Sequence, residues 1–233
     1  MIDIEDWVTN TEFFKLVDDM LGPQTADRLA SLAETILKKT PSEQQLARFA
    51  NQLTNSSCKN LVLHLGLEQK DWEDMEDCYT GMSLIIRIMA LHCWKTKRIK
   101  GKPTKSFCTL LDALKAVDDT RHLLCKIFRE DTDLLDIADV RLQEVPNDDV
   151  LNGLPSNLGN CAIQLGIELG ITVSSIKESL VRHHKDMYQQ MSEILRKWKS
   201  SREVKPTIYR LMLALERVDT GGLDYLKGIY LGQ

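Results

Sequence analysis

The sequence predicts an all-α protein, for three reasons. Apolar residues recur at the three- and four-residue spacing of amphipathic helices, as Leu84, Ile88 and Met89 do within residues 82–94. No segment shows a convincing alternation of apolar and polar residues, and β-branched residues are scattered along the chain. Hydrophobic residues occupy 43% of the 233 positions, against 12 Gly and 6 Pro, which is typical of a packed protein and not of a disordered chain.

Residues 1–41 are expected to form an N-terminal helical extension. Two apolar stretches, within 7–21 and 29–37, are separated by Gly22-Pro23, a pair that interrupts helices. We expect these helices to pack on the bundle that follows. The alternative is a segment that binds a partner or masks a binding surface of the protein itself.

Residues that start and stop helices divide the rest of the chain. Thr40-Pro41-Ser42-Glu43 combines capping hydroxyls, a Pro suited to the first turn and an acid at the positive end of a helix. Breaks at 100–103 and 203–206 are each followed by Thr and a new apolar period. Six helices are expected in the first half, near residues 42–54, 57–65, 68–79, 82–98, 104–117 and 120–129.

An internal repeat appears when the sequence is laid on itself with a shift of 104 residues. Leu65-Gly66-Leu67 then falls on Leu169-Gly170-Ile171, and Trp94-Lys95 falls on Trp198-Lys199. Pro-Thr and then Ala-Leu-x-x-Val-Asp follow in both copies, after the register slips by three residues in the loops, where length changes are tolerated. The repeat predicts two copies of one helical bundle. The second copy is expected to have helices near 147–157, 159–169, 172–183, 186–200, 206–218 and 221–230.

These boundaries predict four parts of the chain. The first bundle spans 42–130, an acidic connector spans 131–146, and the second bundle spans 147–233, all after the extension at 1–41. Residues 131–150 hold seven acids and one base, Arg141, which is typical of a solvated connector. The same stretch contains several apolar residues, so part of it could instead be a short helix.

Single residues in the repeat carry structural expectations. Gly66 and Gly170 are expected to end helices in the left-handed conformation, which only Gly adopts at little cost. Trp94 and Trp198, late in the longest helix of each copy, are expected to seal the cores. Gly166 lies inside a predicted helix and should weaken it by about 1 kcal/mol relative to Ala.

The ordered set of Leu-Gly-Leu, a central helix ending in Trp-Lys, Pro-Thr and Leu-Leu-x-Ala-Leu resembles the death domain. The resemblance covers about 42–130 and 147–231. It implies six-helix antiparallel bundles of the kind found in adaptors and regulators of apoptotic and innate immune (NF-κB type) signalling, where death-fold domains of receptors, adaptors and kinases bind one another. Cys58 and Ala162 stand where many members carry Trp, so a caspase-recruitment or death-effector domain, which are sister folds, remains open.

Charges suggest where such binding would take place. Six acids crowd the third helix of the first bundle, whereas seven bases and no acid lie between Arg87 and Lys105. An acidic face on one bundle can dock head to tail on a basic face of another, and such contacts can propagate. The alternative is an ordinary solvated surface. The predicted partner-binding residues are Asp71, Glu73, Asp74, Asp77, Arg87, Lys97, Arg98 and Lys102 in the first bundle, and Arg196, Lys199 and Arg202 in the second.

Other functions are less favoured by the sequence. No P-loop, dinucleotide-binding, zinc-protease or nucleophile-elbow motif is present, so we expect no catalysis, no cofactor and no metal. A nucleic-acid-binding module using the basic stretch 94–105 is the alternative, although the net charge of −4 opposes it. The acidic start, the lack of an apolar span and six cysteines without a Cys-x-x-Cys pair predict a cytoplasmic protein with reduced thiols that binds no membrane.

Overall fold

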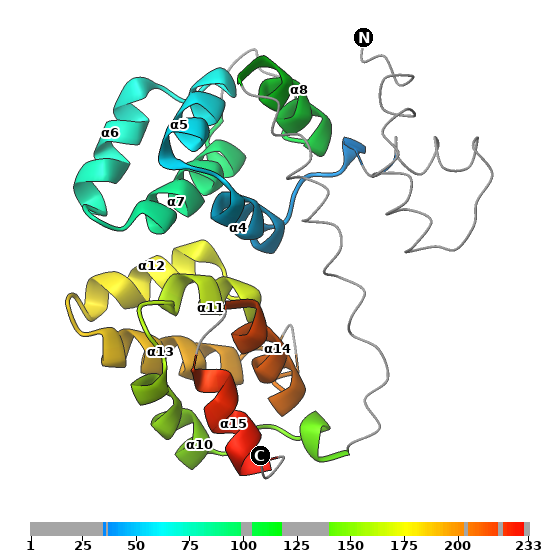
Figure 1. Cartoon of the computed structure of the whole chain (residues 1–233), viewed down its shortest axis with the longest axis vertical. Coiled ribbons are helices and arrows are strands. Elements are labelled where there is room, and N and C mark those ends of the chain that lie inside the picture. The colour runs from blue at the N-terminus through cyan, green and yellow to red at the C-terminus, as the bar shows by residue number, and fades with distance from the viewer. Residues whose placement is uncertain are drawn as a thin grey trace. The chain divides into compact units, whose positions relative to one another are not determined.

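The computed structural model describes Thr35 and residues 37–98, 104–117, 140–202, 205–218 and 221–230. Within these ranges the protein has 11 α-helices and no strand, which confirms the all-α prediction (Figure 1). The chain divides into two compact units, with the boundary between Leu135 and Asp136, inside the predicted connector. None of the helices in the described ranges is long and apolar enough to cross a membrane. The predicted extension at 1–41 and the helix at 120–129 lie almost entirely outside the described residues.

The first described helix of the unit 1 bundle begins at the predicted capping sequence. The Ser42 hydroxyl accepts from the backbone N–H of Gln45 at 3.0 Å, and the Ser42 N–H donates to the Gln45 side chain at 2.9 Å. These two reciprocal hydrogen bonds form a capping box. Thr54 caps the next helix in a similar way, by accepting from the N–H of Ser57. The helices of unit 1 are α4 (Glu43–Gln52), α5 (Asn55–His64), α6 (Gln69–Cys78), α7 (Ser83–Thr96) and α8 (Phe107–Val117).

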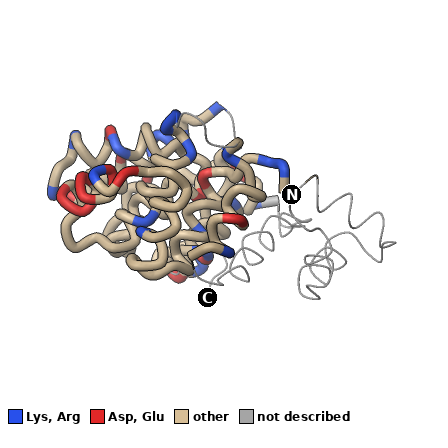
Figure 2. Tube along the Cα trace, turned by 90° about the horizontal axis from the view of Figure 1, so that it is seen from above, with Lys and Arg blue, Asp and Glu red and all other residues tan. Residues whose placement is uncertain are grey.

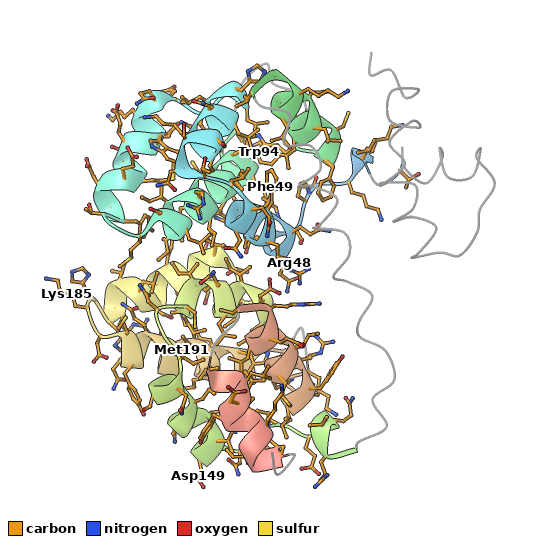
Figure 3. All side chains as sticks on the ribbon, in the orientation of Figure 1. Arg48, Phe49, Trp94, Asp149, Lys185 and Met191 are labelled. Carbon is orange, nitrogen blue, oxygen red and sulfur yellow. The ribbon has the colours of Figure 1, made fainter. Side chains whose placement is uncertain are left out.

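The core of unit 1 forms around α7, which contacts α4, α5 and α6, while α8 packs on α5. Trp94, near the end of α7, is 1% exposed, which confirms that its ring lies in the core. Trp72 of α6 and Phe49 of α4 are also fully buried, and Figure 3 shows Phe49 and Trp94 within the bundle. Burial of these large rings stabilises the unit.

Among its described residues, unit 2 contains six α-helices and two short 3₁₀ segments. The helix predicted at 147–157 is not continuous, because the α-helix ends at Gly153 and a 3₁₀ turn continues to Asn157. Pro155 explains the change, because it has no N–H to donate within an α-helix. The elements are η1 (Val140–Gln143), α10 (Asp148–Gly153), η2 (Leu154–Asn157), α11 (Ala162–Glu168), α12 (Val173–Arg182), α13 (Met187–Lys199), α14 (Ile208–Val218) and α15 (Gly222–Tyr230).

The helices of the two units follow the spacing of the sequence repeat. A shift of 104 carries the bounds of α6 onto those of α12 and the start of α7 onto the start of α13, and a shift of 101 carries α8 onto α14. Gly66 and Gly170 both have left-handed backbones, with φ of 99° and 84°, as predicted. Just as α7 contacts α4, α5 and α6, α13 contacts α10, α11 and α12.

Gly166 also has a packing role, which the expected effect on helix propensity does not include. A Cβ at this position would lie 2.8 Å from Cδ1 of Ile176 and 3.3 Å from Cγ2 of Ile194, because both side chains pack directly on the α11 backbone. We expect Gly166→Ala to lower the free energy of unfolding by about 1–2 kcal/mol despite the better helix propensity of Ala, since overpacking forces side chains or backbone to shift. Urea denaturation followed by circular dichroism would measure the change, and a stabilised variant would contradict the prediction. Gly159→Ala, where a Cβ would meet nothing within 4 Å, is the matched control.

Candidate interaction surfaces

Three of the four predicted acidic side chains on α6 form an exposed outer face. Trp72 anchors the helix in the core, and the three residues that we call the acidic face, Glu73, Asp74 and Asp77, are exposed on the side turned away from it. Acids predominate in the tube over this helix, at the left of Figure 2. The last turn of α6 holds no basic residue. Acids near the negative end of a helix dipole destabilise the isolated helix, so this arrangement does not serve the stability of α6.

Asp71 and Lys97, one from each predicted patch, pair with each other within unit 1. The Lys97 ammonium lies 2.8 Å from Oδ1 and 2.7 Å from Oδ2 of Asp71. The hydrogen bond from Lys97 lowers the pKa of the Asp71 carboxyl below its usual value. Asp71 also accepts from the backbone N–H of Glu68 at 2.8 Å, which caps the start of α6. The pair therefore ties α6 to the end of α7 and is less available to a partner than the acidic face.

Arg87 is likewise engaged inside unit 1. Its half-buried guanidinium donates from Nε to the carbonyl of Ala50 at 2.9 Å and from Nη1 to Oδ1 of Asn55 at 2.7 Å, joining α7 to the end of α4 and the start of α5. Arg98 is exposed just after α7, and Lys102 lies outside the described residues. Of the predicted basic patch in unit 1, Arg98 is thus the described side chain that faces solvent.

In unit 2 the predicted bases differ in their surroundings. Arg196 and Arg202 are exposed, and neither has an ion pair among the described residues. The Lys199 ammonium lies 2.8 Å from Oδ1 of Asp148, which connects α13 to the first turn of α10. Arg196 and Arg202 are therefore the freer part of this predicted patch.

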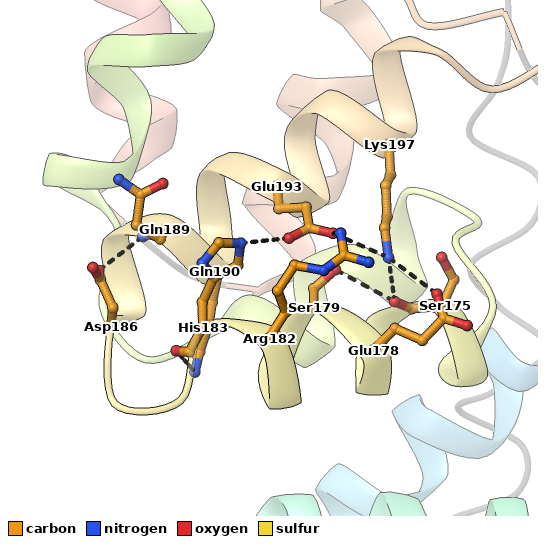
Figure 4. A network of polar contacts seen from close by, with 10 residues as sticks. All are labelled: Ser175, Glu178, Ser179, Arg182, His183, Asp186, Gln189, Gln190, Glu193 and Lys197. Carbon is orange, nitrogen blue, oxygen red and sulfur yellow. Dashed lines mark hydrogen bonds and ion pairs between the residues drawn. The ribbon is translucent and has the colours of Figure 1, made fainter.

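A polar network between α12 and α13 was not anticipated from the sequence (Figure 4). The buried Glu193 carboxylate accepts from Arg182 at 2.7 Å and from Nε2 of His183 at 2.6 Å, and Lys197 lies 3.5 Å away. Burial opposes ionisation of Glu193, but the His183 hydrogen bond and the charges of Arg182 and Lys197 outweigh it and lower its pKa. Lys197 also donates to the carbonyl of Ser175 at 2.7 Å. The sequence did contain a sign that Glu193 is buried, because the repeat aligns it with Met89, a core residue of α7.

A hollow of about 710 Å³ lies in unit 1, beside the end of α7 and the start of α8. Its polar groups have structural contacts: Lys105 donates to the carbonyls of Trp94 and Lys97, at the end of α7 where such groups lack helical donors. Burial raises the pKa of the Cys108 thiol, so Cys108 is not an activated nucleophile. The side chains in the lining include His64, Trp94, Lys105, Cys108, Thr109 and Asp112.

Two of the bases in the predicted nucleic-acid stretch, 94–105, thus contact groups of unit 1. Lys97 pairs with Asp71, and Lys105 binds backbone carbonyls. Phosphate binding depends on the number of cations that can reach the nucleic acid backbone. The internal contacts therefore weaken the case for this alternative.

The described cysteines have no disulfide partners. No disulfide joins any two of Cys58, Cys78, Cys93, Cys108 and Cys161, and Cys125 lies outside the described ranges. Burial raises the pKa of Cys58 to about 12 and that of Cys161 to about 11, so both remain protonated at neutral pH. These two thiols are core side chains and not reactive groups.

The described residues show no metal site, and the comparisons show no relative. Among the residues that the structure describes, no group of three or more His, Cys, Asp or Glu side chains could hold a metal ion. Comparison of the chain with protein-family models, with curated proteins and with solved structures finds no significant match.

Proposed function

We propose that the protein is a non-enzymatic cytoplasmic signalling adaptor or regulator, made of two death-fold bundles that bind death-fold domains of other proteins. The acidic face of α6 is one contact surface, and Arg98, Arg196 and Arg202 belong to basic counterparts. Such binding would place the protein in apoptotic or innate immune signalling of the NF-κB type.

The observation that carries this proposal is the charge arrangement on α6. Glu73, Asp74 and Asp77 are exposed on a helix whose last turn has no basic residue, so the charges repel one another and oppose the helix dipole. A partner that brings cations to this face would relieve both effects. Docking thus gives a reason for an arrangement that folding alone does not favour.

The order of helices supports the death-fold part of the proposal. In the described ranges unit 2 has six α-helices and unit 1 has five, and α5 to α8 follow one another in the same order as α11 to α14, with the same separation between α6 and α7 as between α12 and α13. In both units the helix that ends in Trp-Lys is packed against the three helices before it. This is the central helix in the resemblance drawn from the sequence.

Reversing the charge of the acidic face tests the proposal. We expect D74K/D77K to weaken binding to a cognate death-fold domain at least about tenfold, or ~1.4 kcal/mol, because attraction becomes repulsion at an exposed interface. The measurement is biolayer interferometry of the full chain against immobilised, purified death-fold domains of receptors, adaptors and kinases, at low and high salt.

The matched control is D112K/E216K, which makes the same change in net charge at two exposed acids on α8 and α14, away from the acidic face. Circular dichroism of each variant checks that the helices are intact. The proposal would be rejected if no domain bound the unaltered chain, or if D74K/D77K bound as tightly as the control.

A further inference from the structure

The turn between α12 and α13 exposes large apolar side chains. We call residues 181–188 the α12–α13 corner. Val181 is 79% exposed, Met187 57% and Tyr188 45%, and Val181 is the most exposed large hydrophobic residue in the described ranges. Single exposed apolar residues are ordinary, but three within eight residues of one corner are typical of a contact surface.

The same corner carries positive charge. Lys185 is exposed, and Arg182 keeps 62% of its side chain exposed although it contacts Glu193. The acid in the corner, Asp186, accepts from the N–H of Gln189 at 3.0 Å and so caps α13. Asp186 is itself exposed, so Arg182 and Lys185 leave the corner with an excess of one positive charge beside its apolar side chains, which suits an acidic partner with apolar groups of its own.

Lys185 at the tip of the corner has a left-handed backbone, with φ of 68° (labelled in Figure 3). The repeat aligns it with Gly81, whose φ is 79°. Unit 1 thus makes the same turn with the residue that adopts this conformation at little cost, whereas unit 2 makes it with a lysine. Local strain at an exposed cation is more readily explained by binding than by stability.

The acidic face of α6 has the complementary character. Glu73, Asp74 and Asp77 are exposed on it, and Met82, which follows at the corner between α6 and α7, is 43% exposed. Each chain therefore carries one acidic, partly apolar surface on unit 1 and one basic, partly apolar surface on unit 2. Surfaces of this kind on one polypeptide match each other between copies.

We infer that the α12–α13 corner binds the acidic face of α6 in a second copy of this chain, so that the protein associates with itself head to tail. The inference rests on the proposed docking function and names the partner of that face. Lys185 would lie opposite Asp74 or Asp77, with Val181 and Met187 covered by the contact.

Sedimentation velocity of the full chain tests the inference. We expect association that rises with protein concentration and weakens between about 0.05 M and about 0.5 M NaCl, as screening shortens the range of the charges. D74K and K185E should each weaken association about tenfold. The double variant D74K/K185E exchanges the two charges and should restore association to within about threefold of the unaltered chain, which damage to the fold would not do.

E216K and K115E are the matched controls, because they make the same charge changes at exposed positions on α14 and α8. A chain that is monomeric at about 100 µM in low salt would overturn the inference. The inference would also fail if K185E associated with itself as strongly as the control variants do. If self-association is absent but D74K/D77K still weakens binding to the purified death-fold domains, only the inference of self-association fails. The docking function of α6 then stands.

Discussion

Trp198→Ala is expected to lower the free energy of unfolding of unit 2 by about 3–5 kcal/mol, because the lost ring leaves a cavity in a core that can only partly close. Trp198 is 0% exposed, and its helix contacts three of the other α-helices in the unit. A domain of this size is stabilised by roughly 5–15 kcal/mol in total, so the variant would be close to unfolded at 37 °C. Urea denaturation followed by far-UV circular dichroism measures the loss.

Two further variants separate the ring from the helix that carries it. Arg196→Ala changes an exposed residue two positions away and should shift stability by no more than about 0.5 kcal/mol. Trp198→Phe should retain most of the stability, because it keeps an aromatic ring and removes an indole N–H that has no hydrogen-bond partner in the described part of the chain. A loss below about 1 kcal/mol for Trp198→Ala would show that the ring does not hold the core together.

Glu193→Ala is expected to destabilise unit 2 by about 2–3 kcal/mol, since it leaves the cations of the network without their buried partner. The value lies at the low end for a buried ion pair because Arg182 is 62% exposed and can be solvated. Glu193→Met should cost less, because methionine stands at the equivalent core position, Met89, and is 1% exposed there. Equal losses for the two variants would contradict this account.

The same carboxylate should make unit 2 sensitive to acid. The pKa of Glu193 is lowered from 4.5 in the folded state, so its contribution to stability is complete above that value and is lost as the pH falls through the folded pKa. We expect the unfolding free energy to fall from pH 5 to pH 3 in the unaltered protein and to fall less in Glu193→Met. Glu178→Gln, at a 69% exposed carboxylate 3.6 Å from Lys197, is the control and should keep the acid sensitivity.

The local features were predictable because they depend on neighbours in the sequence. The capping box at Ser42, the left-handed Gly66 and Gly170, and most helix bounds follow from residues within one or two turns. The end of α10 was predictable too, since Pro155 is visible in the sequence. The repeat added the buried positions of Trp94 and Trp198, because the same spacing occurs twice.

The candidate surfaces were predicted less completely, for a physical reason. The charge patches were predicted from charged residues that lie close together in the sequence. The sequence does not show which of these residues form ion pairs or hydrogen bonds within the folded unit. Lys97 pairs with Asp71 across 26 residues, and Arg87 binds Ala50 across 37. Among the described residues, these contacts leave Glu73, Asp74, Asp77 and Arg98 as the exposed part of the predicted surface in unit 1.

The sequence by itself determined the all-α class, the repeated order of helices and the ends of most of them, because hydrophobic periodicity and capping act over a few residues. Only the tertiary structure decided that Gly166 makes room for Ile176, that Glu193 is buried among cations and that Val181 is exposed to solvent. These outcomes depend on which helix faces come together, and packing between residues distant in the chain sets them.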